Sequence, residues 1–254
     1  MVTRYDGSYL TQREIPKLAT LEAKTDKADG ETLQLRAGAS SIAVPVLRRS
    51  LPTDATLFGT SLALVDQCEE VGRWLATALG PPPPVVGGAN ILSALQRALQ
   101  RTPSYRLLHA PENATPEPLR GGAGLSDLAP LLLLSEESLE ALNARRGSEG
   151  LSPVPMGRFR PNLVVKNCPE AHSEDGWSSV TIGEAKFRVV GPCPRCTVPD
   201  VEQSSGRRDT ASEGPMATLK SYRVKRRQGV LFGVYLAPLN PGVVVRVGDV
   251  VKAK

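Results

Sequence analysis

The chain has 254 residues, which is enough to bury a sizeable hydrophobic core in one large domain or two small ones. Its 31 basic and 26 acidic residues leave a diffuse formal charge of +5, which suits an anionic cofactor or an acidic protein partner, and no motif supports nucleic acid binding. Four cysteines in a chain of this length argue against a disulfide-stapled scaffold and for a reducing compartment, and the longest apolar run, residues 128–134, is far too short to span a membrane.

The beginning of the chain predicts short β-strands. Residues 2–5 and 8–11 flank Asp6-Gly7, a dipeptide typical of a two-residue hairpin turn. Turn-like breaks separate three further extended segments that carry the residues favoured in strands. We therefore expect a hairpin followed by strands at residues 19–23, 32–36 and 41–46.

One helix follows these strands. Residues 66–80 carry apolar side chains at helical spacing, and Gly80 with Pro81 marks the end of the helix. The spacing places Trp74 on the buried face, so we expect it in the core.

A proline-rich insertion interrupts the pattern from residue 81 to about residue 104. Its four consecutive prolines favour an extended surface loop, with a short helix at residues 90–101. Residues 105–109 resume as a strand, in which we expect His109 to be structural. The Pro/Gly-rich stretch 110–123 indicates a linker, and we place the domain boundary between residues 117 and 118.

The second half of the chain predicts a small β-barrel with a few peripheral helices. Residues 131–134 form an apolar strand, after which Ser135 is placed to cap a helix that runs to Asn143. From Phe159 onward the chain consists of short strands separated by Gly, Asp and Asn turns. The predicted fold class is α+β, mainly β.

The stretch Gly191-Pro192-Cys193-Pro194-Arg195-Cys196 concentrates the chemistry of the chain. It holds two of the four cysteines, with a permanently charged guanidinium between them. A strand-like segment, residues 185–190, precedes it, and an extended-looking segment, residues 197–201, follows. We therefore expect the two cysteines on a tight, proline-stiffened turn.

Three kinds of functional site are considered for these two cysteines. A redox dithiol needs a helix after its Cys-x-x-Cys, and no helical pattern follows Cys196. A zinc site needs four ligands, and the other candidates, which are scattered, are Cys68, Cys168, His109 and His172. The third is a single metal-ligating thiolate, with Arg195 stabilising it or holding an anionic cofactor beside it. Two buried, inert cysteines are the plain alternative, and these six residues alone favour it.

The six residues are part of a longer series of motifs. The series comprises residues 157–165, 174–177, 180–184, 231–235 and 245–251. In this order and spacing it resembles the MOSC domain of the molybdenum cofactor sulfurase C-terminal superfamily. Within that superfamily the chain is most similar to the mitochondrial amidoxime-reducing component and its bacterial relatives. The resemblance implies a MOSC domain at residues 118–254 and, more loosely, a partial N-terminal MOSC-associated β-barrel domain at residues 1–117.

The resemblance also implies strands before residue 2. In the family they carry residues that contact the cofactor. Without them, the strand at Val2 would be an edge strand with no partner. We therefore expect an incomplete N-terminal β-barrel domain and a sequence that begins part-way through the fold. The alternative is a divergent member of the family.

The cofactor that the resemblance implies is the molybdenum cofactor, Mo-molybdopterin. Cys196 matches the family's metal-ligating cysteine and is the expected catalytic residue. Arg160 and Arg195 would anchor anionic groups through forked hydrogen bonds that lysine does not reproduce. Cys193 is expected to be a structural thiol.

Four further positions complete the implied cofactor site. Asn162 would offer a donor and an acceptor to the pterin edge, and Tyr235 matches a residue that lines the pocket. Asp127 aligns with a family aspartate. Pro194 stands where the amidoxime reducers usually have a small polar residue, so one side-chain hydrogen bond is absent there.

The implied reaction is the reductive removal of oxygen from N-hydroxylated substrates such as amidoximes and hydroxylamines. The sequence carries no haem, flavin or iron–sulfur motif, so the electrons would come from a separate protein. In eukaryotic relatives this is cytochrome b5 with its flavin reductase, and bacterial partners differ. The expected location is the cytosol or the cytosolic face of the mitochondrial outer membrane.

Two other functions stay open. One is a module like the C-terminal part of the sulfurases, which share the Gly-Pro-Cys-x-Arg-Cys pattern but depend on a pyridoxal-phosphate domain that this sequence lacks. The other is a molybdenum cofactor carrier without catalysis of its own.

Overall fold

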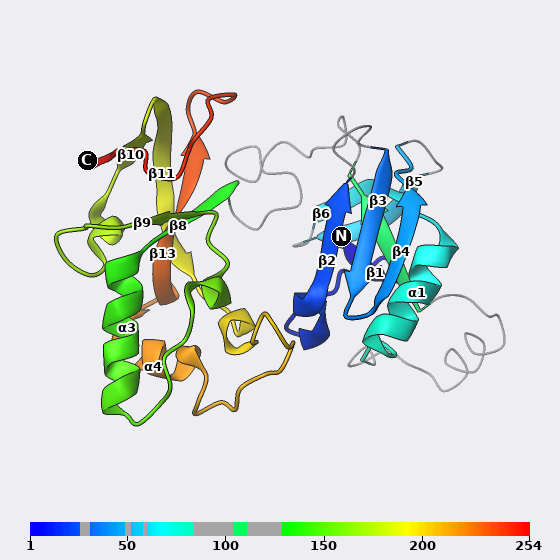
Figure 1. Ribbon diagram of the computed structural model, residues 1–254, viewed down its shortest axis with the longest axis horizontal. Coiled ribbons are helices and arrows are strands. Elements are labelled where there is room, and N and C mark those ends of the chain that lie inside the picture. Colours follow the sequence, from blue (N-terminus) through cyan, green and yellow to red (C-terminus); the bar gives the residue numbers. More distant parts are fainter. Residues whose placement is uncertain (26–30, 49–51, 58–59, 84–103, 111–128) are drawn as a thin grey trace. The chain divides into compact units, whose positions relative to one another are not determined.

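The computed structural model describes residues 1–25, 31–48, 52–57, 60–83, 104–110 and 129–254 (Figure 1). The chain divides into two compact units: Met1–Pro116 with Ser204–Arg207, and Glu117–Gln203 with Arg208–Lys254. Most of the predicted insertion, nearly all of the predicted linker and Asp127 lie outside the described residues. The boundary between residues 117 and 118 stays a prediction.

The first unit contains two antiparallel sheets and one described α-helix. The four-stranded sheet has the order β1-β7-β6-β5, and the three-stranded sheet has the order β2-β3-β4. Its strands are β1 (Val2–Arg4), β2 (Leu21–Thr25), β3 (Thr32–Ala37), β4 (Ser40–Pro45), β5 (Pro52–Leu57), β6 (Thr60–Asp66) and β7 (Tyr105–His109). Its helices are the 3-10 helix η1 (Pro16–Thr20) and α1 (Glu69–Leu79).

The core of the first unit forms around α1. Val71, Leu75 and Leu79 recur at helical spacing and are buried in one cluster with Val44 of β4 and Tyr105 of β7. Burying an aliphatic side chain of this size contributes about 1.5–3 kcal/mol, so this face accounts for the stability of the helix.

The predicted hairpin is present, but its first strand does not lack a partner. The Arg4 N–H donates to the Ser8 carbonyl at 2.8 Å, which closes the hairpin. On its other side β1 pairs antiparallel with β7, where Val2 lies opposite Leu107. The expectation of an unpartnered strand was wrong, because the partner comes from far along the chain and local patterns do not reveal it.

The structure corrects two further predictions in this unit. Strands β5 and β6 were not predicted, and since β6 extends to Asp66, the helix begins only at Glu69. Trp74 is half-buried at the rim of the core rather than inside it. Its indole N–H donates to the Ser40 hydroxyl at 2.9 Å, a polar contact that holds the ring at the surface.

The second unit is built on a seven-stranded sheet that curves into a nearly closed barrel, which confirms the mainly β fold. The order is β14-β10-β11-β13-β8-β9, with β12 paired to β13, and every pairing is antiparallel except β8 with β9. The strands are β8 (Leu131–Ser135), β9 (Leu163–Val165), β10 (Ser179–Ile182), β11 (Ala185–Pro194), β12 (Val224–Lys225), β13 (Gly229–Pro238) and β14 (Val251–Ala253). The helices are α3 (Glu136–Ser148), α4 (Pro215–Tyr222) and the 3-10 helices η2 (Met156–Phe159), η3 (Ser173–Gly176) and η4 (Val198–Asp200).

Strand β13 lies at the centre of this unit and is buried on both faces. Phe232 packs in one cluster with Leu142 of α3 and Leu219 of α4. Val234 and Leu236 pack in a second cluster with residues of β8, β9, β10 and β11. Burial on both sides explains why this strand is almost continuously apolar in sequence.

The junction of β8 and α3 is fixed by buried polar groups. Ser135 caps the helix as predicted, since its hydroxyl accepts the Ser138 N–H at 3.2 Å. The fully buried carboxylate of Glu174 accepts from the Ser138 hydroxyl at 2.7 Å and from the Ser135 N–H at 3.3 Å. The helix continues past Asn143 to Ser148, further than predicted, where buried Arg146 donates to two backbone carbonyls.

The cysteine-containing stretch does not form the predicted tight turn. Strand β11 continues through Pro194, which lies opposite Leu231 of β13, and its register shifts twice along the way. These bulges interrupt the ladder of hydrogen bonds, so prolines without an N–H are accommodated in the strand. The segment after it is also not extended as predicted, because it contains η4.

Candidate functional site

A pocket of about 370 Å³ lies beside the end of β11. This volume lies in the range of about 300–1,000 Å³ that is common for ligand and cofactor sites. Of the seven residues that the sequence singled out, the structure brings six together in its lining: Arg160, Asn162, Pro194, Arg195, Cys196 and Tyr235. Their chemical roles stay predictions, and the seventh residue, Asp127, lies outside the described residues.

The two cysteines beside the pocket have different surroundings. Cys193 is 3% exposed and belongs to the core cluster beside β13, whereas Cys196 is exposed. Both are free thiols. Both cysteines line the pocket, but Cys196 is the exposed one, whereas Cys193 is packed largely into the core.

Arg195 joins the end of β11 to its neighbours. Its N–H donates to the Val230 carbonyl at 2.7 Å, and its Nη2 donates to the Phe159 carbonyl at 2.7 Å. Its Nη1 lies 3.2 Å from the Cys193 Sγ. Both terminal nitrogens of the guanidinium are thus engaged with the protein, so Arg195 is placed chiefly to position this segment, with remaining N–H groups for a ligand.

Arg160 differs from Arg195 because its guanidinium makes no hydrogen bond or ion pair with the described residues. It is exposed at the pocket, and its backbone has φ 55° and ψ 44°. This left-handed conformation costs a residue with a Cβ about 1–2 kcal/mol. A strained residue with an unpartnered charge at a pocket supports a binding role.

Asn162 and Tyr235 shape the pocket in different ways. The Asn162 Oδ1 accepts the Leu132 N–H at 2.8 Å, so the predicted acceptor is already engaged by the protein. Its amide nitrogen has no partner among the described residues and remains as a donor. Tyr235 is 9% exposed and lies opposite Gly191 of β11, where its ring forms part of the pocket wall.

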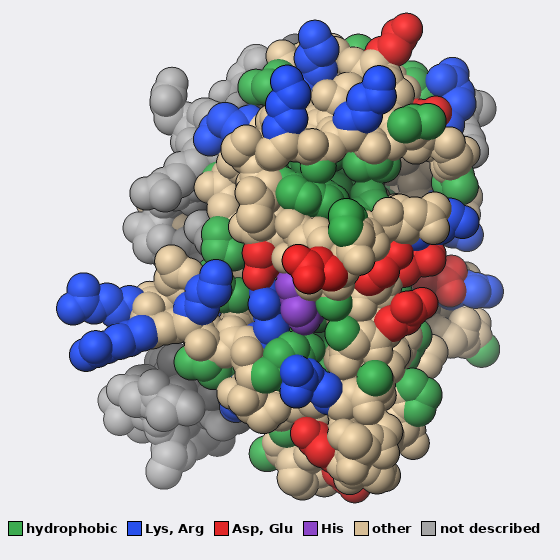
Figure 2. All heavy atoms as spheres, turned by 90° about the vertical axis from the view of Figure 1, so that its left-hand side faces the viewer, with side chains coloured by type: hydrophobic (Ala, Val, Ile, Leu, Met, Phe, Trp, Pro, Cys, Tyr) green, Lys and Arg blue, Asp and Glu red, His purple; other side chains and the backbone are tan. Residues whose placement is uncertain are grey.

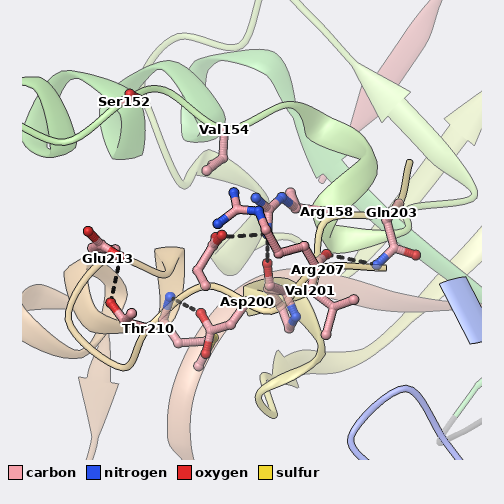
Figure 3. A network of polar contacts seen from close by, with 12 residues as sticks. Ser152, Val154, Arg158, Asp200, Val201, Gln203, Arg207, Thr210 and Glu213 are labelled. Atoms are coloured by element: carbon pink, nitrogen blue, oxygen red, sulfur yellow. Dashed lines mark hydrogen bonds and ion pairs between the residues drawn. The ribbon is translucent and has the colours of Figure 1, made fainter. Parts of the chain in front are cut away.

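A buried polar network holds η2 against η4 (Figure 3). Arg158 pairs with Asp209 at 2.9 Å, with the two side chains 7% and 9% exposed. Arg158 Nη1 also donates to the Pro199 carbonyl at 3.3 Å. Asp200 accepts the Met216 N–H of α4 at 3.0 Å, and burial raises the pKa of its carboxyl. The network fixes the segment that carries Arg160 relative to the segment that carries Cys196.

Sequence reasoning missed this network and the apolar part of the pocket. Arg158 lies inside the motif at residues 157–165. Its partner Asp209 lies in an ordinary loop sequence that belongs to no motif. The unpredicted lining residues are Ala129, Pro130, Leu132, Phe159, Cys193 and Val198.

The described residues also bear on the zinc alternative. Among them, no three His, Cys, Asp or Glu side chains are close enough to hold a metal ion. A site made of protein ligands alone is therefore incomplete in this part of the chain. If a cofactor already supplies most of the metal's donor atoms, a single protein thiolate is enough to complete the ligand set.

No helix in the described parts of the chain has the length and apolar character needed to cross a membrane.

Comparison with known proteins finds two matching family models and several similar proteins. The model of the MOSC domain family matches residues 121–252, and that of the MOSC N-terminal beta barrel domain matches residues 1–82. Mitochondrial amidoxime reducing component 2 of Rattus norvegicus is 33% identical, over 98% of this chain and 70% of that protein. Mitochondrial amidoxime-reducing component 1 of Homo sapiens is 28% identical over the same shares. Molybdenum cofactor sulfurase of Oryza sativa subsp. japonica is 31% identical, over 91% of this chain but only 27% of that protein.

Proposed function

The chain belongs to the MOSC domain family, and from this premise we propose that it binds the molybdenum cofactor and reduces N-hydroxylated compounds. Relatives named as amidoxime reducing components and as molybdenum cofactor sulfurases both support a function connected with this cofactor. The observation that carries the proposal is a pocket lined by both the exposed thiol of Cys196 and the guanidinium of Arg160, which has no partner among the described residues.

The residues present fit such a cofactor. Its anionic phosphate requires a cation, which Arg160 supplies without having to break an existing ion pair among the described residues. Its metal favours a soft ligand, which the Cys196 thiolate provides. The amide nitrogen of Asn162 is free to donate to the pterin edge, and Phe159 and Tyr235 supply apolar walls.

The proposed reaction is a two-electron reduction of an N–O bond. An amidoxime takes up two electrons and two protons, its N–O bond breaks, and an amidine and one water molecule leave. When bound, the cofactor supplies the redox chemistry at molybdenum. Cys196 would ligate the metal, and Arg195 would hold the segment that carries Cys196 in place through Val230 and Phe159.

The electrons come from a separate protein in this proposal. The names of the rat and human relatives associate them with mitochondria, and we extend this association to the chain as part of the proposal.

The test combines metal analysis with turnover. The chain is produced in cells that make the cofactor, and bound molybdenum is measured by mass spectrometry. Benzamidoxime is then offered with reduced methyl viologen as a small electron donor. We expect benzamidine formation in proportion to bound molybdenum, and chain produced without the cofactor is the control. Bound molybdenum without turnover would contradict the reductase.

The alternative is a cofactor carrier or a module like the C-terminal part of the sulfurases. The alignment with the rice sulfurase over 91% of this chain favours it. A carrier would bind molybdenum cofactor, fail to reduce benzamidoxime, and transfer the cofactor to a cofactor-free molybdoenzyme. That transfer is measured as recovery of the second enzyme's activity.

A further inference from the structure

We propose that the basic hairpin, residues 224–229, is the docking surface for an acidic electron-donor protein. This inference rests on the proposed function, because it concerns the delivery of electrons to the same pocket. Four observations carry it: the charge of the hairpin, its exposed apolar residue, its rigid base and its connection to the pocket.

The basic hairpin carries three consecutive cations, Lys225, Arg226 and Arg227. All three are exposed, and their side chains make no hydrogen bond or ion pair with the described residues. Figure 2 shows Lys and Arg side chains that project beyond the rest of the surface on the left of the view. Val224, next to the cations, is 57% exposed. An apolar contact bordered by charge is typical of a protein interface.

The base of the basic hairpin is fixed in place. Val224 pairs with Val230, and Lys225 pairs with Gly229. Immediately before the hairpin, Arg223 pairs with Asp175 at 2.6 Å, and its Nε donates to the Leu231 carbonyl at 2.9 Å. The charges are therefore presented on a preorganised support, which lowers the entropy lost when a partner binds.

The basic hairpin is connected to the pocket through β13. Val230 follows the hairpin in β13, and its carbonyl accepts the N–H of Arg195, a residue that lines the pocket, at 2.7 Å. Arg227, at the tip, is three residues before Val230, and at about 3.3 Å per residue this places it within roughly 10 Å of Val230. A protein bound to the tip is thus brought close to the segment that carries Cys196.

The positive charge of the basic hairpin indicates which kind of partner binds it. Three unpaired cations attract a carboxylate-rich surface, and such attraction raises the association rate of redox partners at low salt. The donor must supply two electrons for each substrate, so a one-electron haem protein reacts twice. Since electrons are needed at this pocket, a protein donor is favoured over an anionic membrane or RNA.

The decisive experiment measures binding, which does not depend on turnover. The hairpin variant combines Lys225→Glu, Arg226→Glu and Arg227→Glu. The control variant combines Lys186→Glu, Arg188→Glu and Lys252→Glu, three exposed positions toward the other end of β11 and on β14, with the same change in net charge. Oxidised cytochrome b5 is the acidic probe, titrated onto the full chain in calorimetry at low salt.

We expect the hairpin variant to bind cytochrome b5 at least about tenfold more weakly than the unaltered chain. The control variant should bind it less than about twofold more weakly. Equal weakening of both variants would show an effect of net charge alone and overturn the proposal. No binding to the unaltered chain, or unchanged binding to the hairpin variant, would overturn it as well. Selective loss of binding to phosphatidylserine vesicles or to RNA, with cytochrome b5 binding intact, would assign the hairpin to those surfaces instead.

A turnover assay separates this inference from the proposed function. With reduced methyl viologen, the hairpin variant should reduce benzamidoxime within about twofold of the unaltered chain, because a small donor needs no docking surface. With reduced cytochrome b5, its KM for the donor should rise about tenfold. Absence of turnover with both donors in the molybdenum-loaded, unaltered chain would contradict the proposed function and leave the binding result to decide the docking site.

Discussion

Cys193 and Cys196 differ in exposure although only two residues separate them, and this difference yields the first prediction. Cys196→Ser replaces a soft thiolate with a hard, largely neutral hydroxyl. We expect turnover per bound molybdenum to fall at least about 100-fold, because in the proposed function this change removes the protein ligand of the metal. Cofactor content should fall only partly, since Arg160 and Asn162 still line the pocket. Molybdenum analysis and benzamidoxime turnover on the same samples measure both quantities.

Cys193→Ser is the matched control. It places a hydroxyl in an apolar cluster and should cost about 1–2 kcal/mol of stability. The serine oxygen can still accept from Arg195, so most turnover per bound molybdenum should remain. Equal loss of turnover in both variants would support a dithiol mechanism, and equal loss of metal would support a zinc site.

The left-handed backbone of Arg160 gives the second prediction. Glycine adopts this conformation without strain, so Arg160→Gly should stabilise the fold by about 1 kcal/mol. The same change removes the unpartnered cation of the pocket, so bound molybdenum should fall several-fold. Thermal unfolding and metal analysis test the two effects.

Arg227→Gly is its control, because Arg227 also has a positive φ, 68°, but is not among the residues that line the pocket. It should gain similar stability and keep its molybdenum. If Arg160→Gly retains full cofactor content, Arg160 does not bind the anionic group.

The elements around the pocket show which local structures can be predicted from sequence patterns and which cannot. The strand at residues 105–109 and the cap at Ser135, a serine just before a helical pattern, were both predicted from the local sequence. The end of β11 was not, because two prolines are typical of a turn when read alone. The bulges that accommodate them depend on the pairing with β13, which is not local.

Glu174 of η3, which contacts the junction of β8 and α3, gives the third prediction. Its buried carboxylate accepts from Ser135 and Ser138, so Glu174→Gln would turn an acceptor into a donor facing those donors. We expect a loss of about 2–3 kcal/mol. A Trp74→Phe background leaves Trp177 as the only tryptophan, so its fluorescence reports urea unfolding of the second unit.

Exposed Glu170→Gln in the same background is the control and should change stability by less than about 0.5 kcal/mol. A similarly small loss for Glu174→Gln would show that the carboxylate is not needed to hold this junction.

The arrangement of the strands was the least predictable feature of the molecule. The class of fold follows from many short strands separated by turn residues. The pairing of β1 with β7 and the ion pair of Arg158 with Asp209 join segments distant in sequence, so spacing alone does not show them. Six of the residues that line the pocket were predicted, because the family resemblance relates five separate motifs. The buried residues that hold the pocket in place, such as Asp209, follow no comparable sequence pattern.

The last prediction concerns the pH dependence of the second unit and depends on His172. Both ring nitrogens are buried without a partner among the described residues, and the ring packs near Tyr222 and Phe232. Burial lowers the pKa of His172 below its ordinary value of 6.5, and Arg223 lowers it further. Arg145 acts in the same direction, whereas the carboxylates of Glu174 and Asp175 oppose the shift.

Because this pKa is lower in the folded state, the unfolded chain binds the proton more tightly. The contribution of neutral His172 to stability is therefore fully present above pH 6.5 and is lost as the pH falls through the folded pKa. In the Trp74→Phe background, the free energy of unfolding of the second unit should fall between pH 7 and pH 5. His172→Phe keeps a ring in the same packing and should reduce this fall, whereas His109→Phe, a change in the first unit, should leave it unchanged. An identical pH dependence in all three proteins would show that His172 is not the group that titrates.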